Sequence, residues 1–292
     1  MAYVTEENLT DVVTERWQNI PDARLRHVMP ALIKHLHAFV REIEPTQAEW
    51  ATAIDWLSRT GRLCSGKRQE FILVSDVFGV SMLVDAINHR QSSRATPSTV
   101  EGPFHVPNAP PLENAANMAK GAPGIPCFVT GTVRGLDGEA VTGATLDLWQ
   151  TDGEGLYEDQ RDVQEPWMRG LYRSQPDGSF LIRTVVPIAY TVPMDGTVGE
   201  LINHTNVSHM RPAHIHFAVA APGYRGVVTH LFRRGDEYLD SDVVCGVKEP
   251  LIVDFVGRPA GKAPTGEMVK TPFYQVHYDF VLQKEKKAAK AA

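Results

Sequence analysis

We expect this chain to fold as an antiparallel β-sandwich core with an N-terminal helical region, an architecture that is mainly β with added α-helix. Two features predict this. Helical periodicity runs from Glu6 to about Arg90, and short apolar runs rich in β-branched residues alternate with turn pairs from about Pro126 onward. The 292 residues, of which 43% are hydrophobic, are enough to bury one large core with a smaller helical layer.

The helical region carries its own start and stop signals. Thr46 and Glu49 form a capping box before an apolar run, and Gly61 is expected to end that helix. Between Phe71 and Val84, apolar residues lie almost all round the helix, which indicates burial on more than one face. Either a helical cap on a neighbouring core or a self-association surface explains that pattern.

A polar segment with a proline, residues 91–99, separates the two regions and is expected to be a linker. We therefore assign residues 1–100 to a helical region that includes this linker and any dimerisation surface, and residues 101–283 to the β-sandwich. Residues 284–292 are rich in lysine and alanine and are expected to form a disordered tail or a frayed helix end.

Turn pairs place the strands of the β-sandwich. Asp137-Gly138, Asp177-Gly178 and Pro222-Gly223 are turn signals, and about eight strands suffice for two packed sheets. The expected strands are Phe128–Val133, Ala144–Gln150, Gly170–Ser174, Phe180–Val185, His214–Ala220, Val227–Phe232, Leu251–Val256 and Phe273–Leu282.

Composition excludes several classes of function. A net charge of −6 and a pI near 6.0 argue against a nucleic-acid partner, because such proteins concentrate lysine and arginine on one face. Cys64, Cys127 and Cys245 are too far apart for a CxxC metal site and indicate no disulfide framework. We find neither a secretory signal nor an apolar stretch of about 20 residues, so we expect a cytoplasmic protein without a membrane partner.

The segment RPAHIHF, residues 211–217, is the most informative in the chain. His214 and His216 are two residues apart on an expected strand, so their side chains project from the same face and can bind one metal ion. Such a pair is weak evidence alone, because strand histidines are more often ordinary residues than metal ligands.

Two tyrosines in loops strengthen the case. Tyr157 ends the segment DGEGLY after one strand, and Tyr190 lies in VPIAYTVP after another. A buried tyrosine usually packs its ring and hydrogen-bonds its hydroxyl, so each tyrosine alone would be unremarkable. Together with His214 and His216, in these contexts, they resemble the intradiol ring-cleaving dioxygenases, the family of catechol, chlorocatechol and hydroxyquinol 1,2-dioxygenases. The resemblance covers most of the chain.

By this resemblance, Tyr157, Tyr190, His214 and His216 hold one iron(III) ion per chain, with both tyrosines bound as phenolates. The ligand chemistry agrees, because two hard, anionic phenolates favour a hard trivalent ion over zinc. The resemblance also implies that Tyr190 leaves the iron when substrate binds and then acts as a general base.

Two further residues near these ligands have alternative interpretations. The resemblance places Arg211 beside the substrate, where its guanidinium would stabilise charge that develops on the ring. The alternative for Arg211 is a surface salt bridge. His230, on the next expected strand, would either support the metal site or be an ordinary strand histidine.

The substrate implied by the resemblance is a small aromatic diol or triol, which reacts with O2. Asp76 lies in an otherwise apolar helix, which is costly unless the carboxylate has a partner, and a third substrate hydroxyl would be one. A capping or interhelical hydrogen bond is the alternative. The resemblance assigns the pocket walls to Leu73, Asp76, Val100, Gly102, Pro103, Phe104, Val192, Pro193 and Arg211.

The pattern VEGPFH at residues 100–105, together with Asp76, looks like the hydroxyquinol 1,2-dioxygenases. That subfamily cleaves benzene-1,2,4-triol between its 1,2-hydroxyls and yields maleylacetate through its enol form, 3-hydroxy-cis,cis-muconate. The resemblance also implies a homodimer through the N-terminal helices, in some members with a phospholipid at the dimer interface.

Three other functions stay open at this point. A catechol or chlorocatechol 1,2-dioxygenase would share the metal and the mechanism but have a different pocket. A non-catalytic β-sandwich binding module would be colourless. A zinc hydrolase would be colourless and indifferent to oxygen, and it would use histidine or carboxylate ligands.

Overall fold

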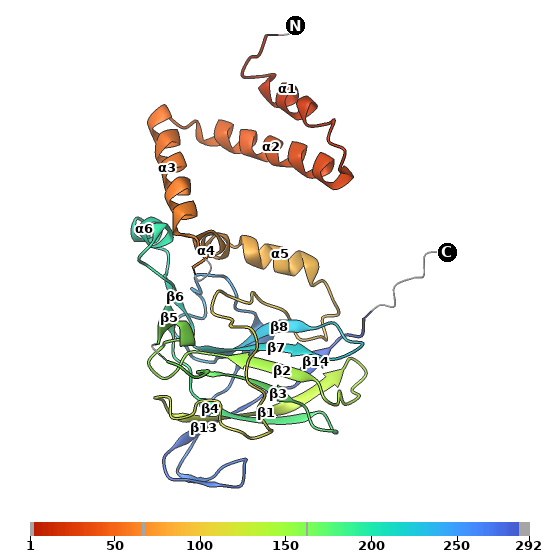
Figure 1. The fold of residues 1–292 in the computed structure, drawn as a ribbon, viewed down its shortest axis with the longest axis vertical. Helices are drawn as coiled ribbons and strands as arrows, with labels where there is room; N and C mark the ends of the chain where they lie inside the picture. Colours follow the sequence, from red (N-terminus) through yellow and green to blue (C-terminus); the bar gives the residue numbers. More distant parts are fainter. Residues whose placement is uncertain (1–2, 66–67, 162, 286–292) are drawn as a thin grey trace, which may run out of the picture. The chain divides into compact units, whose positions relative to one another are not determined.

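The computed structural model describes residues 3–65, 68–161 and 163–285, and the chain divides into two compact units, Met1–Arg59 and Thr60–Ala292 (Figure 1). Within the described ranges, no helix is long and apolar enough to cross a membrane. The first three helices are α1, α2 and α3, which span Leu9–Arg16, Ala23–Ile43 and Gln47–Leu63. The boundary between the units therefore falls inside α3.

The predicted capping box at the start of α3 is confirmed. The Glu49 N–H donates to Thr46 Oγ1 at 3.2 Å, and the Thr46 N–H donates to the Glu49 carboxylate at 2.7 Å. The expectation that Gly61 ends this helix is wrong, since α3 continues to Leu63. Gly61 lacks the positive φ that a helix-terminating glycine adopts, so it is simply a helical residue in the last turn.

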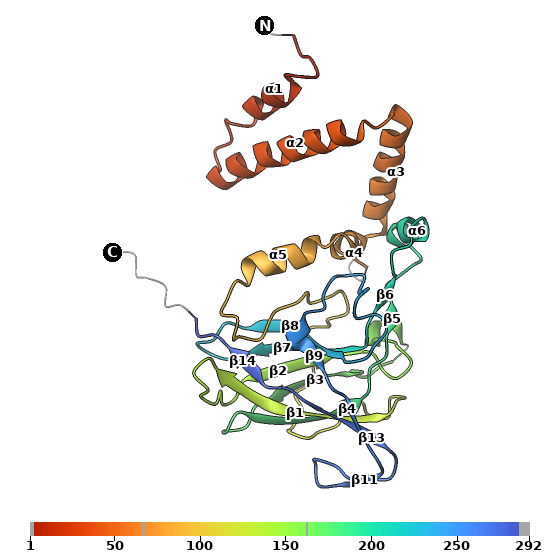
Figure 2. The same ribbon diagram turned by 180° about the vertical axis from the view of Figure 1, so that it is seen from behind.

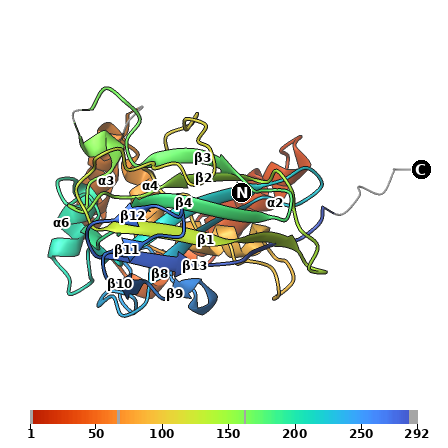
Figure 3. The same ribbon diagram turned by 90° about the horizontal axis from the view of Figure 1, so that it is seen from below.

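Two five-stranded sheets pack face to face in the second unit, as the views in Figures 1 and 3 show. The first sheet has the order β3, β2, β7, β8, β9, with bounds Arg169–Arg173, Thr145–Trp149, His214–Ala220, Val227–Arg233 and Ile252–Val253. The second has the order β10, β13, β1, β14, with β4 also paired to β1, and bounds Val256–Arg258, Phe273–His277, Pro126–Gly135, Phe280–Leu282 and Ser179–Val185. Buried side chains such as Leu146, Phe217, Val129 and Phe280 fill the space between them. The predicted β-sandwich is confirmed.

Shorter elements complete the second unit. β5 (Tyr190–Thr191) pairs with β6 (Met210–Arg211), and β11 (Gly261–Lys262) pairs with β12 (Met268–Val269). The 3-10 helices η1 and η2 span Glu158–Gln160 and Glu249–Leu251.

Not every strand pair is antiparallel. β13 and β14 pair in parallel with β1, and β9 pairs in parallel with β8; Figure 2 shows these strands from behind. The strand expected at Leu251–Val256 divides in two because β9 joins one sheet and β10 joins the other. The strand expected at Phe273–Leu282 divides near Tyr278, whose carbonyl oxygen would lie 1.7 Å from a Cβ at Gly131, so only glycine fits there.

Helices α4 (Glu70–Val77) and α5 (Val80–Asn88) lie over the face of the sheet that contains β7 and β8, and α6 (Thr197–Asn203) packs near α4 (Figure 1). Leu73 and Met82 are buried, whereas Phe78 and Leu83 are 59% and 61% exposed. The expectation that these helices are buried on more than one face is therefore wrong for the single chain. Each buries one face and presents the other to solvent.

Residues 91–99 follow α5 and form a segment that packs against the strands of the sandwich. The Thr96 N–H donates to the Val281 carbonyl of β14 at 2.9 Å, and the Thr99 N–H donates to the Val228 carbonyl of β8 at 2.8 Å. Polar residues can be buried in this way because the main chain satisfies its hydrogen bonds on neighbouring strands. Of the expected tail, residues 286–292 lie outside the described residues, and Lys284 forms an ion pair with Glu139.

Candidate metal centre

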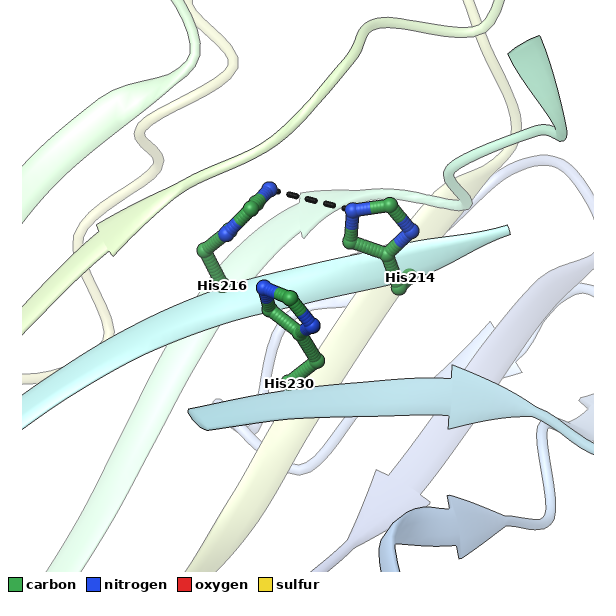
Figure 4. Close-up of side chains that lie close together, drawn as sticks. All are labelled: His214, His216 and His230. Atoms are coloured by element: carbon green, nitrogen blue, oxygen red, sulfur yellow. Dashed lines mark hydrogen bonds between the residues drawn. The ribbon is translucent and has the colours of Figure 1, made fainter. Parts of the chain in front are cut away.

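The alternation of side chains along β7 decides which residues reach the site. Ile215 and Phe217 belong to the core between the sheets, so His214 and His216 face the other side of β7. His230 of β8 pairs directly with His216 in the sheet. His214 Nε2 and His216 Nε2 are 3.0 Å apart, and one ligand atom from each histidine lies within 4.8 Å of the others (Figure 4). This buried group can hold a metal ion.

Tyr157 and Tyr190 bring two oxygens to the same place. Tyr157 Oη lies 2.9 Å from His216 Nε2, 3.5 Å from His214 Nε2 and 3.2 Å from Tyr190 Oη. The structure thus brings together all four side chains that we predicted as metal ligands, from two loops and one strand. Their donor atoms converge on one buried point.

Asp152 shapes the loop that carries Tyr157. Its fully buried carboxylate accepts hydrogen bonds from the backbone N–H of Glu154 at 2.9 Å and of Leu156 at 3.3 Å, and it pairs with Arg161. This role of Asp152 was not predicted from the sequence. An aspartate followed by glycines at a tight turn is the signal that could have revealed it.

Burial and neighbouring groups keep His214 and His216 neutral. His214 Nδ1 donates to the Pro212 carbonyl at 2.6 Å, which leaves the lone pair on Nε2. The ring of His216 stacks on Trp149, with centroids 4.6 Å apart. Burial is the main cause that lowers the pKa of His214 and His216 well below the usual histidine value. Neutral imidazole is the form that binds metal ions.

Tyr157 needs a nearby cation to become a phenolate. Burial, followed by the neighbouring Tyr190, raises the pKa of Tyr157 well above its usual value when no cation is present. A bound metal ion reverses this, because its charge strongly favours an anionic oxygen ligand. The set of two phenol oxygens and two imidazole nitrogens therefore fits a highly charged metal ion better than a small uncharged ligand.

Arg211 lies at the edge of this group of donors and is only 3% exposed, so the surface salt bridge that we considered for it is wrong. Its Nη1 lies 3.5 Å from Tyr190 Oη and 3.2 Å from His214 Nε2. Its Nε donates to Asp242 at 3.1 Å. Burial alone would lower the pKa of Arg211, but Tyr190 and Asp242 outweigh it and raise the pKa, so the guanidinium is always charged.

Two cavities beside the loop from Val100 to Phe104 contain the predicted pocket walls. One, of about 550 Å³, is lined by Leu73, Pro103, Phe104, Val192 and Pro193. The other, of about 760 Å³, is lined by Asp76, Val100, Gly102 and Pro103. Pro103 and Gln69 line both cavities, and a Cβ at Gly102 would lie 3.5 Å from the His216 ring. Arg211 lines neither cavity, although it was predicted as a wall residue.

Asp76 is a buried carboxyl at the edge of the larger cavity, with 3% exposure. Burial is the main cause that raises its pKa above the usual aspartate value, and Ser81 and Arg211 offset this only in part. The hydrogen bond to Ser81 of α5 is the interhelical contact that we considered as the alternative role of Asp76, and the same carboxyl also lines the cavity.

Comparison with known proteins gives a consistent result along the chain. Residues 22–96 match the family model described as the catechol dioxygenase N terminus, and residues 100–284 match the model described as dioxygenase. The chain is 47% identical to the 6-chlorohydroxyquinol 1,2-dioxygenase of Cupriavidus pinatubonensis, over 97% of this chain and 99% of the relative. It is 43% identical to the hydroxyquinol 1,2-dioxygenase of Nocardioides simplex, over 95% of each.

Solved structures agree with the sequence relatives. The hydroxyquinol 1,2-dioxygenase from Pseudomonas putida superposes with a TM-score of 0.90 at 46% identity, covering 96% of this chain and 99% of that one. The catechol 1,2-dioxygenase from Pseudomonas arvilla shares the fold, with a TM-score of 0.82 at 24% identity, over 98% of this chain and 94% of that one.

Proposed function

The chain belongs to the intradiol ring-cleavage dioxygenase family, and from this premise we propose that it opens hydroxyquinol (benzene-1,2,4-triol) between its 1,2-hydroxyls. Both atoms of O2 enter the product, 3-hydroxy-cis,cis-muconate, which is the enol form of maleylacetate. The observation that carries this proposal is the convergence of Tyr157, Tyr190, His214 and His216 at one buried point. Gly102, which lines the same cavity as Asp76, approaches the ring of His216. Relatives at 47% and 43% identity that are named for hydroxyquinols support the substrate.

The proposed cofactor is iron(III), one ion per chain, held by Tyr157 Oη, Tyr190 Oη, His214 Nε2 and His216 Nε2. Two phenolates favour a hard trivalent ion over zinc, and the neutral histidines leave Nε2 free to bind it. When bound, the iron would draw electron density from the chelated substrate oxygens and prepare the ring for reaction with O2. The family match removes support for a zinc hydrolase or a non-catalytic β-sandwich module.

The chain's own groups have distinct proposed roles. Tyr190 Oη takes a proton from a substrate hydroxyl as the substrate binds, while Tyr157 and the histidines hold their positions. Arg211 Nη1, 3.5 Å from Tyr190 Oη, stabilises negative charge that develops beside it. Asp76 accepts a hydrogen bond from the third hydroxyl of the triol, which catechol lacks.

Oxygen uptake by the purified protein tests this function directly. We expect faster turnover of hydroxyquinol than of catechol or a chlorocatechol, and a visible absorption band from phenolate bound to iron. Tyr190→Phe should lower kcat by about 10² to 10⁴-fold, the usual contribution of a general base. Tyr224→Phe, which loses a hydroxyl bonded to Glu139 away from the site, is the matched control. A preference for catechol would be consistent with the proposed iron site but would contradict the role of Asp76 in binding the third hydroxyl. A protein that holds iron but takes up no oxygen with any of these substrates would contradict the proposed activity.

We further propose that the chain forms a homodimer through its N-terminal helices, with a phospholipid bound at that interface. Apolar side chains are exposed along α2, including Leu36 and Phe39, and along α4 and α5, including Phe78 and Leu83. Such surfaces on a soluble domain usually mark a contact with another molecule. Light scattering would give the mass in solution, and mass spectrometry of an organic extract would detect the lipid. A monomer at all concentrations would reject the proposal.

A further inference from the structure

The direction of Nη1 of Arg211 depends on what holds the other nitrogens of its guanidinium. The guanidinium has donors at Nε, Nη1 and Nη2 in one rigid plane, and any of them could turn toward the site. Here Nη1 faces Tyr190 Oη and His214 Nε2, at 3.5 Å and 3.2 Å. The other two donors face a single buried carboxylate, that of Asp242.

Asp242 is itself fixed on both sides. Its Oδ1 accepts from Arg211 Nε at 3.1 Å, and its Oδ2 accepts from Arg211 Nη2 at 3.4 Å and from the Gly246 N–H at 2.9 Å. The Val244 N–H donates weakly to Oδ1 at 3.4 Å. Both side chains of the ion pair are buried, at 3% exposure for the arginine and 2% for the aspartate. The carboxylate therefore has a defined direction before any substrate arrives.

The chain around Asp242 is built to bring it close to Arg211. The Val243 N–H donates to the Met210 carbonyl at 3.1 Å, which ties this loop to β6, the strand that carries Arg211. A Cβ at Gly246 would lie 3.1 Å from Asp242 Oδ2 and 3.2 Å from Arg211 Nη2. A larger residue there would press on the ion pair, so glycine allows the close approach.

We propose that Asp242 is a positioning residue that aims Nη1 of Arg211 at the gap between Tyr190 and His214. This rests on the proposed function, because it assigns Asp242 to the same site. Asp242 does not touch the substrate; it acts through Arg211. Since a catalytic group misplaced by about 1 Å can cost on the order of 10²-fold in rate, the direction of Nη1 matters more than the mere presence of the charge.

The test compares Asp242→Asn with Asp254→Asn. Asp254 pairs with Arg234 at 2.9 Å, but both side chains are more than half exposed, so its loss should leave the enzyme unchanged. For Asp242→Asn we expect kcat on hydroxyquinol to fall by about 10²-fold while the Kd for hydroxyquinol, measured without oxygen, changes less than about threefold. We also expect a shift of the visible phenolate band, because Tyr190 would lose its fixed neighbour.

A double-variant cycle separates positioning from general damage. If Asp242 acts only through Arg211, Arg211→Gln and the double variant Arg211→Gln/Asp242→Asn should agree in kcat and band position within about twofold. This comparison does not need Asp242→Asn alone to fold. The double variant leaves no unpaired buried charge, and in Arg211→Gln the Asp242 carboxylate keeps its hydrogen bonds from the Val244 and Gly246 N–H groups. Effects that multiply in the double variant, or an Asp242→Asn enzyme with wild-type kcat and spectrum, would overturn the inference. Wild-type protein that does not cleave hydroxyquinol would instead overturn the proposed function.

Discussion

Replacing Asp76 with asparagine should lower activity on hydroxyquinol while leaving the fold at least as stable. The carboxyl is 3% exposed, and burial is the main cause that raises its pKa. A carboxyl with a raised pKa destabilises the folded protein at pH values above that pKa, and this cost disappears as the pH falls through it. Asparagine has the same size and no such cost, so the free energy of unfolding at neutral pH should stay equal or rise.

The expected loss of specificity follows from one hydrogen bond. A hydrogen bond from the third substrate hydroxyl to a carboxylate is worth about 1.5 to 3 kcal/mol, whereas one to the neutral amide oxygen of asparagine is worth about 0.5 to 1.5 kcal/mol. The difference of about 1 to 1.5 kcal/mol corresponds to roughly a 5- to 13-fold decrease in kcat/KM for hydroxyquinol. Catechol lacks that hydroxyl, so its kcat/KM should change little. The ratio of the two values should therefore fall by the same factor.

The assay is oxygen uptake on both substrates, combined with unfolding in urea. Asp85→Asn is the control, because Asp85 lines the same cavity but already accepts from Ser98 Oγ at 2.8 Å and pairs with His89 at 2.7 Å. Asp85→Asn should lower the free energy of unfolding and leave the ratio of kcat/KM for hydroxyquinol to kcat/KM for catechol unchanged. If Asp76→Asn kept the wild-type ratio of the two kcat/KM values, or unfolded at a lower urea concentration than wild type, Asp76 would be a structural hydrogen-bonding group and would not recognise the third hydroxyl.

Three other substitutions test separate parts of the structure. His216→Ala should lower the affinity for iron by more than the roughly 10- to 100-fold expected for losing a group that only orients a ligand. The variant should therefore hold less iron per chain than wild type after dialysis against a chelator, and full iron retention would remove His216 from the ligand set. Leu146→Ala empties a fully buried position in the core and should cost about 2 to 5 kcal/mol in urea unfolding without moving the visible band. The pKa of His105 is raised above 6.5, chiefly by its hydrogen bond to Asp147, so its stabilisation is present below that value and is lost as the pH rises through the folded pKa. His105→Gln should therefore destabilise the protein more at about pH 5.5 than at about pH 8, and an equal effect at both would contradict the ion pair.

Local patterns were enough to predict most of the sandwich, whereas the four proposed ligands came from the resemblance to a family. The bounds of β7 agree with the predicted strand, because alternation of core and site residues leaves little freedom in its register. That alternation puts His214 and His216 on one face, and the chemistry of two phenols and two imidazoles points to a metal. The capping box at Thr46 is equally local, since both of its hydrogen bonds span three residues.

Features that depend on distant segments could not be predicted in this way. The carboxylate that holds Arg211 lies 31 residues further along the chain, and no periodicity links the two. The parallel pairing of β13 with β1 and the packing of residues 91–99 against two sheets depend on long-range strand pairing. Gly61 continues its helix although glycine often ends one, because tertiary context overrides a weak local preference.

Residue types and spacing reveal which chemistry is available, because ligand preference and strand alternation are properties of short segments. Burial and direction are different, since they depend on what the rest of the chain places around each side chain. The sequence could thus identify Arg211 and Asp76 as candidates, but whether each was at the surface or desolvated was open. Desolvation and long-range hydrogen bonds, which exist only in the folded chain, turn Arg211 toward Tyr190 and leave Asp76 at the wall of a cavity.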